Sequence, residues 1–336
     1  MNVAAAILPL LLLASSAFSE INRLDRWFLV EDPPNANFSA SRTGSGAGTT
    51  VTLTATNAAI PSGTDIGYQS FNGNTAEESS AGYTFDPGSD FTVAIDYSIT
   101  YGGTNPLNLG IGFGIGEDGN GANSAGVALA RTEVNVFGNL LPAIGIGGAA
   151  RIDDVNQPIA TLTGILNGLS DNGSFFITYT AATGTITVGR SATPGAGAPE
   201  NAATFTGIQN SWQGRDLIVS FFMRSEGWTG GTATATFDNL RVLNGTPKGI
   251  PPRVTSVART GGMLDFSFKG GTGWDYFIQG GTDLVTFPDD LTGEPGTVLS
   301  ESPAGSGIFR GSVDISGKGD AYFLRFTDQP PTGSGE

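Results

Sequence analysis

The sequence has 336 residues, a length that suits two domains of ordinary size. Its 31 acidic and 16 basic residues give a formal net charge of −15, which repels nucleic acid and anionic membranes and favours divalent cations or neutral partners. The chain has no cysteine and no histidine, which excludes disulfides, Ser-His-Asp and Cys-His hydrolysis, and the common zinc sites.

The first nineteen residues, "MNVAAAILPLLLLASSAFS", predict a secretory signal peptide that is cleaved before Glu20. Their apolar run, Val3 to Ala14, is too short to cross a bilayer, and small residues follow it. No second long apolar run occurs, so we expect an exported protein, secreted or at the cell surface, without membrane insertion.

Alternation of apolar and polar residues predicts half-buried antiparallel strands through residues 20–246. The clearest runs are "TTVTLTAT" (49–56), "FTVAIDYSIT" (91–100) and "DLIVSFFMR" (216–224), and "FFITYTAATGTITVGR" (175–190) predicts a hairpin. The best helical candidate is a turn or two within 160–169. Many strands and almost no helix indicate an all-β sandwich.

Glycine and alanine alternate with large apolar residues in three of the predicted strands. The runs are "LNLGIGFGIG" (107–116), "GVALAR" (126–131) and "AIGIGG" (143–148). If these strands are neighbours, one face of their sheet is nearly bare backbone, which suggests close approach by another group. That group is either a ligand in a groove or, as we expect, a loop of the chain itself.

A cluster of proline and glycine in "LNGTPKGIPPRV" (243–254) predicts a linker at residues 247–252. Short strand patterns follow over residues 253–328, the size of a small immunoglobulin-like or fibronectin-like β-sandwich. Residues 329–336 predict a flexible tail.

Four motifs together resemble the concanavalin A-like, or laminin-G-like, jelly rolls of secreted bacterial proteins. They are "Y-x-F-x-x-x-x-D-F-x-V-x-I-D-Y" (83–97), "ITYTAATGTITV" (177–188), "WQGRDLIVSFFMRS" (212–225) and "TATATFDNLRV" (232–242). The resemblance covers about residues 25–245 and implies an antiparallel jelly-roll sandwich with lectin-like carbohydrate binding. The segment "YFIQGGTDLVTF…YFLRF" resembles small C-terminal β domains of exported proteins.

In the motif "TATATFDNLRV" (232–242), the alternation of apolar and polar residues shifts by one position within the strand. Ala233, Ala235 and Phe237 share one face, but Leu240 is the next apolar residue after Asp238, so a bulge is predicted there. In calcium-bearing carbohydrate-binding jelly rolls, a similar "FDNV" setting binds a structural ion, so the resemblance makes Asp238 a calcium-ligand candidate. Alternatively, Asp238 accepts backbone N–H groups that the bulge frees.

The turn "GEDGNGANS" (116–124) offers a second set of hard oxygen ligands for Ca²⁺. The candidates are Glu117, Asp118, Asn120 and Asn123. The alternative, which we favour, is an ordinary solvated hairpin turn, because Asp, Asn and Gly are common turn residues.

Catalysis is not expected. The glucanases of the resembled superfamily carry their acids as Glu-x-Asp-x-x-Glu on one strand, and that pattern is absent. Glu117 and Asp118 are adjacent, so on a strand they would point to opposite sides. A divergent carboxylate-dependent glycosidase remains an alternative.

Sugar binding needs aromatic platforms beside polar groups. Trp228 in "RSEGWTGG" and Trp212 in "QNSWQGRDL" stand in loop-like segments, and Glu226 lies beside Trp228. We expect Trp228 to be exposed, although either tryptophan could instead fill the core. The sequence therefore predicts an exported, non-catalytic protein that binds polysaccharide or cell-surface glycan, with a purely structural or adhesive β module as the next alternative.

Overall fold

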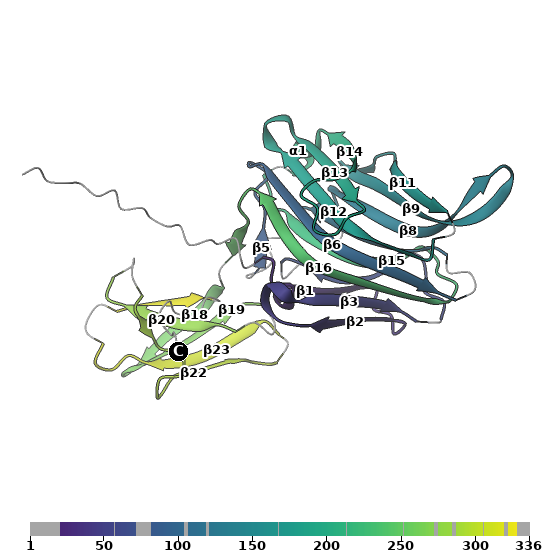
Figure 1. Ribbon diagram of the computed structural model, residues 1–336. Coiled ribbons are helices and arrows are strands. Elements are labelled where there is room, and N and C mark those ends of the chain that lie inside the picture. The colour runs from purple at the N-terminus through teal and green to yellow at the C-terminus, as the bar shows by residue number, and fades with distance from the viewer. Residues whose placement is uncertain are drawn as a thin grey trace, which may run out of the picture.

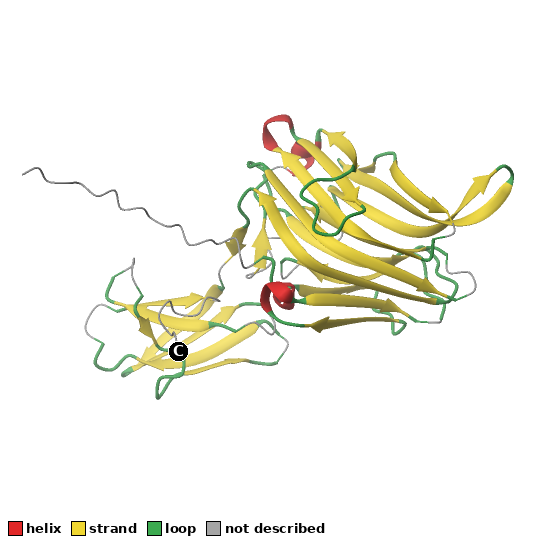
Figure 2. Cartoon of the chain, in the orientation of Figure 1, coloured by secondary structure: helices red, strands yellow, loops and turns green. Residues whose placement is uncertain are grey.

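The computed structural model describes residues 21–56, 58–71, 82–103, 107–118, 121–166, 168–212, 214–250, 252–271, 275–283, 287–304, 306–318 and 322–327. These residues form an almost entirely β structure in which every strand pair that is assigned a register is antiparallel (Figure 2). The signal peptide predicted for residues 1–19 and the tail at 329–336 lie outside the described residues.

Two large sheets form a sandwich from residues 28–244 (Figure 1). The eight-stranded sheet contains, in spatial order, β1 (Phe28–Asp32), β4 (Thr64–Gln69), β15 (Ile218–Ser225), β7 (Leu109–Gly116), β8 (Ser124–Val136), β9 (Asn139–Ile152) and β10 (Val155–Asn156), with β11 (Ala160–Leu166) also paired to β9. The seven-stranded sheet contains β14 (Asn201–Thr206), β13 (Thr185–Ser191), β12 (Ser170–Thr180), β6 (Phe91–Gly102), β16 (Thr232–Asn244), β3 (Thr50–Ala55) and β2 (Phe38–Thr43).

The core lies between these sheets and follows the predicted alternation. In β3, for example, Val51 and Leu53 are fully buried, while Thr50, Thr52 and Thr54, which alternate with them, are only partly buried. Aromatic rings meet across the core, as between Phe221 on β15 and Phe237 on β16, whose centroids are 4.6 Å apart. The prediction of an antiparallel all-β sandwich is confirmed.

The helix predicted within 160–169 is wrong. Residues Ala160–Leu166 form β11, which pairs with β9 over the run from Gly148 to Ala143. The described α-helix is the short α1 (Ile208–Trp212), accompanied by the 3-10 turns η2 (Leu24–Arg26), η3 (Gly46–Gly48) and η4 (Ala181–Thr183). The η4 turn closes the hairpin of β12 and β13 that the sequence predicted.

The segment predicted as a linker is partly a strand. Residues Lys248–Ile250 form β17, which pairs with β5 (Gly82–Thr84) in a separate two-stranded sheet. Beyond it lie two small sheets. One contains β18 (Arg253–Thr260), β19 (Met263–Lys269), β23 (Ile308–Asp314) and β22 (Val298–Glu301), and the other β21 (Asp289–Asp290), β20 (Phe277–Gly281) and β24 (Phe323–Thr327).

Candidate functional site

The two tryptophans chosen from the sequence are core residues. Trp228 is 1% exposed. Its backbone bridges to Ile60, and its backbone N–H donates to the Ser225 hydroxyl at 2.9 Å. Trp212 is 0% exposed, and its indole N–H donates to the Asn123 carbonyl at 2.6 Å. The prediction that Trp228 is an exposed contact is therefore wrong, and neither ring can stack on a sugar.

Glu226 is exposed and belongs to a small ionic cluster. Its carboxylate accepts from the Arg224 Nε at 2.6 Å and from the Ser62 hydroxyl at 2.9 Å. Arg224 also forms an ion pair with Asp65 at 3.2 Å. The hydrogen bond from Arg224 lowers the pKa of Glu226. Glu226 as a ligand contact stays a prediction.

The turn at 117–123 uses its side chains within the protein. Glu117 is buried and accepts from the Asn123 amide at 2.9 Å, while the Asn123 Oδ1 accepts from the Asp154 N–H, also at 2.9 Å. Asp118 accepts from the Ala122 N–H at 2.9 Å. Asn120 lies outside the described residues. These contacts fit the turn interpretation, and calcium at this turn stays a prediction.

The predicted bulge in β16 is confirmed. The pairing of β16 with β6 shifts between Asp238 and Arg241, and Asn239 adopts a left-handed φ of 48°. The Asn239 amide donates to the buried Asp96 at 2.7 Å, and Arg241 donates to the same carboxylate at 2.9 Å. Burial alone would raise the pKa of Asp96. The hydrogen bonds from Ser174, Gly195 and Asn239 and the charge of Arg241 outweigh burial and lower it.

Asp238 lies opposite Asp96 in the strand register, and burial and the Asp96 charge raise its pKa. Its side chain hydrogen-bonds with Thr50, so the predicted capping of free backbone N–H groups is not seen among the described residues. Arg241 supplies the positive charge beside these acids. Within the described ranges, no three His, Cys, Asp or Glu side chains are grouped so that they could hold a metal ion. Calcium at Asp238 stays a prediction.

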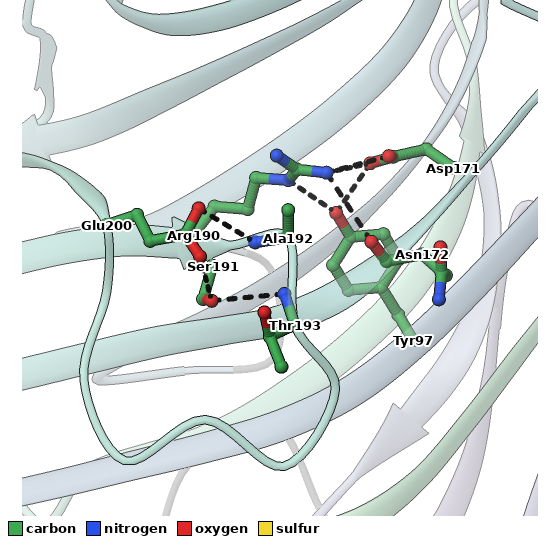
Figure 3. A network of polar contacts seen from close by, with 8 residues as sticks. All are labelled: Tyr97, Asp171, Asn172, Arg190, Ser191, Ala192, Thr193 and Glu200. Carbon is green, nitrogen blue, oxygen red and sulfur yellow. Dashed lines mark hydrogen bonds and ion pairs between the residues drawn. The ribbon is translucent and has the colours of Figure 1, made fainter.

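A second polar network is buried on the core side of the same sheet (Figure 3). Arg190 on β13 donates to both carboxylate oxygens of Asp171 at 2.7 and 2.9 Å and to the Tyr97 hydroxyl at 2.9 Å. The Arg190 and Asp171 side chains are each 7% exposed. Burial is the main reason that the pKa of Tyr97 is raised. Because this network faces the core, it is structural.

A loop does cross a sheet, but on the other side of the molecule from the glycine-rich strands. Residues 192–199 lie over the outer face of the seven-stranded sheet, where the Gly195 N–H donates to Asp96 at 3.0 Å. A Cβ on Gly189 would lie 2.7 Å from the Pro199 ring. Figure 3 shows this loop held by Glu200, which accepts from Ser191 and Ala192.

The glycine-rich strands β7, β8 and β9 are adjacent, which is the condition under which the sequence predicts a bare face, and that face lines a groove. The groove has a volume of about 570 Å³, within the range of ligand sites. Its floor follows rows of paired residues, such as Gly114 with Gly126 and Gly126 with Ala149. Among the described residues, no loop covers most of this floor, so the expectation of a covering loop is not met there. Ile159 comes close to the floor, lying over Gly147.

Phe222 is an aromatic residue that lines the groove on this face. It pairs with Gly67 on one side and Gly112 on the other, so it has no side-chain neighbour on either strand. A Cβ on Gly112 would lie 2.5 Å from the Phe222 Cζ. The ring therefore lies down along the sheet and is only partly buried.

Polar groups line the same groove as the Phe222 ring. Gln69, Ser220, Ser124, Asn156 and Gln157 line the groove together with four charged residues. The charged residues are Asp65, Asp118, Arg151 and Arg224. Burial raises the pKa of Asp65 to about 6, although the charge of Arg224 opposes that shift.

Sequence reasoning missed Phe222 even though its signal was present. In "DLIVSFFMR", Phe221 follows the core alternation, so Phe222 must point to the opposite face. That this face also carries glycine on both neighbouring strands depends on pairing between residues more than a hundred positions apart, which the sequence pattern alone does not give.

No family model matches the chain, and no curated protein matches its sequence. Solved structures with a similar arrangement include an alginate lyase from Alteromonas sp. 272, at 9% identity and a TM-score of 0.32, covering 67% of this chain and 95% of that one. Lectin I from Ulex europaeus, in complex with the methyl glycoside of α-L-fucose, has 13% identity and a TM-score of 0.32, with 65% and 97% covered. The winged bean acidic lectin complexed with methyl-α-D-galactose has 12% identity and a TM-score of 0.30, with 64% and 99% covered. At these values the likeness carries no argument about function.

Among the described residues, no helix has the length and apolarity needed to cross a bilayer.

Proposed function

We propose that this protein is an exported, non-catalytic glycan-binding protein whose binding site is the groove on the outer face of the eight-stranded sheet. The observation that carries this proposal is the Phe222 ring, which lies flat over Gly112 in a groove lined with amide and hydroxyl groups. A pyranose ring has an apolar C–H face and polar edges, so it suits a flat aromatic surface with hydrogen-bonding groups around it.

The proposed absence of catalysis rests on how the acids of the groove are engaged. Asp65 forms an ion pair with Arg224, and Asp118 accepts a backbone hydrogen bond within its own turn. Asp65 has a second acid, Asp32, opposite it in the strand register, but Asp32 does not line the groove, so the lining itself offers no pair of facing acids such as a glycosidase uses. Release of reducing sugar from a polysaccharide by the purified protein would contradict this part of the proposal.

Affinity electrophoresis tests the binding site. We expect native gels that contain a soluble polysaccharide to retard the wild-type protein. The Phe222→Ala variant should be retarded much less, because we expect its affinity for the polysaccharide to be at least tenfold lower. Phe222→Trp keeps an aromatic surface and should retain binding. Phe137→Ala is the matched control, because Phe137 is fully exposed on the turn between β8 and β9, outside the groove. Equal retardation of wild type and Phe222→Ala would remove Phe222 from the site.

A further inference from the structure

The glycines of the groove differ in why the fold needs them. Five glycines line it: Gly67, Gly114, Gly116, Gly121 and Gly126. A Cβ on Gly67 or Gly126 would lie 2.2 or 2.7 Å from a backbone oxygen of the next strand. A Cβ on Gly116 would lie 2.9 Å from the Ser124 Cβ, and Gly121 has a φ of 78°. For these four, the fold itself accounts for glycine.

At Gly114 the fold does not require glycine. Its φ is not in the left-handed region, and an added Cβ would meet nothing closer than the Ala125 carbonyl oxygen at 3.4 Å, an ordinary contact. It lies in the middle strand of the groove, between Ser220 on β15 and Gly126 on β8. Strand interiors lose packing and entropy through glycine, so a glycine that the fold does not require suggests close approach by a ligand.

The groove is long in the direction that crosses the strands. Its lining comes from all seven strands on the path from β1 to β10, beginning at Val30 and reaching Asn156. Neighbouring strands are about 4.8 Å apart, so the groove runs roughly 30 Å across the sheet. A single sugar would fill a small part of that length.

The lining is also electrically balanced. It holds two acids and two bases, and the bases are already paired, Arg224 with Asp65 at 3.2 Å and Arg151 with Asp154 at 3.3 Å. Each guanidinium in the lining therefore already has a carboxylate beside it, which weakens its attraction for the carboxylate or sulfate of an acidic chain. The net charge of −15 over the whole protein adds repulsion toward such a chain.

From these observations we infer that the groove takes an internal stretch of an uncharged, extended polysaccharide that crosses the strands and lies directly on Gly114. This inference rests on the proposed function and specifies its ligand. Gly114 is then the residue that sets the depth of the groove, and Phe222 supplies the stacking surface beside it.

The test compares Gly114→Val with Gly164→Val. Gly164 is also a strand glycine with room for a Cβ, since its nearest contact would be the Ile144 carbonyl oxygen at 3.9 Å, but it does not line the groove. Both variants should melt within a few degrees of the wild type. We expect hydroxyethyl cellulose, glucomannan or arabinoxylan in native gels to retard wild type and Gly164→Val, and Gly114→Val to bind at least tenfold more weakly.

The same gels also test whether the ligand must be uncharged and whether it must be longer than one sugar. Alginate and polygalacturonate should not retard the wild type, and free glucose, mannose or xylose should not release it from the neutral polymer. Retardation by the acidic polymers alone, or release by a free monosaccharide, would overturn the inference while glycan binding stands. Normal binding by Gly114→Val with loss in Phe222→Ala would keep the site and overturn the role of Gly114. If none of the polymers retards the wild type, the proposed function itself fails.

Discussion

The side-chain amide of Asn239 donates to the Asp96 carboxylate at 2.7 Å, from a residue that the β16 bulge places in the left-handed region. The bulge therefore has a specific result. It turns an amide and, two residues later, the Arg241 guanidinium toward one buried acid on the neighbouring strand β6. The acid and the amide in "FDNLRV" thus serve different neighbours, because Asp238 bonds with Thr50.

Two substitutions at Asn239 separate its conformation from its hydrogen bond. Asn239→Gly keeps the left-handed backbone without strain but loses the bond to a charged group, so we expect a loss of about 1.5–3 kcal/mol in the free energy of unfolding. Asn239→Ala should cost about 1 kcal/mol more, because alanine is strained at that φ. Urea unfolding measures both. A glycine variant as stable as the wild type would show that the bond to Asp96 contributes nothing.

The buried pair of Arg190 and Asp171 predicts a double-mutant result. Arg190→Met leaves the Asp171 carboxylate without its partner in the core, so it should cost about 3–5 kcal/mol. Adding Asp171→Leu removes the stranded charge and should recover part of that loss. Chemical denaturation of the two single variants and the double variant checks this. A double variant less stable than Arg190→Met would contradict it.

Burial of Trp228 predicts a large cost for Trp228→Ala, about 3–5 kcal/mol. Trp228→Phe should cost much less, because the indole N–H is buried without a partner in the described part of the chain and its removal relieves that penalty. Thermal melts of the two variants distinguish ring loss from N–H loss. Equal destabilisation by both would argue against an unsatisfied N–H.

Asp65 predicts a pH dependence of stability. Its folded pKa of about 6 lies above the ordinary value of 3.8, so the folded state holds this proton more tightly than the unfolded state. Protonated Asp65 therefore contributes to the free energy of unfolding in full below about pH 4, and this contribution is lost as the pH rises through about 6. The loss is up to about 3 kcal/mol. Unfolding curves between pH 4 and 7 should show a smaller decline for Asp65→Asn, and parallel declines would contradict the shifted pKa.

Calcium can be tested by its removal. A ligand that binds only the folded state stabilises it by about 2.7 kcal/mol at a hundredfold excess over its dissociation constant. If Asp238 or the turn at 117–123 binds calcium, EDTA should lower the melting temperature by several degrees, and Asp238→Ala should abolish the difference. Identical wild-type melting curves with and without EDTA would remove calcium from both places.

The sequence predicted what depends on local alternation. The strands around Val51, Phe91 and Val219 and the bulge at Asp238 all follow from which side chains are apolar in a short window. The helix predicted within residues 160–169 is wrong because a short apolar run suits a helix or a strand equally, and only the pairing with β9 decides between them.

The candidate site depended on contacts between distant segments. The flanking glycines suggested an open loop at Trp228, but its backbone pairs with that of Ile60, 168 positions earlier, and its side chain is buried. The groove was visible in the sequence only as runs of glycine. The sequence does not show which sheet a loop of the chain will cross. Segment 192–199 crosses the seven-stranded sheet, not the glycine-rich strands of the other sheet.

The pairing of β17 with β5 also determines how the protein would respond to force. A pull on the small C-terminal sheets would act first on Lys248–Ile250, which is held by the backbone bonds of β17 to β5 and by the ion pair between Lys248 and Asp216 at 2.8 Å. This three-residue strand is far shorter than β16, which immediately precedes it and lies between two partners. Under tension, β17 would detach before any strand of the large sandwich, lengthening the connection while the groove keeps its shape.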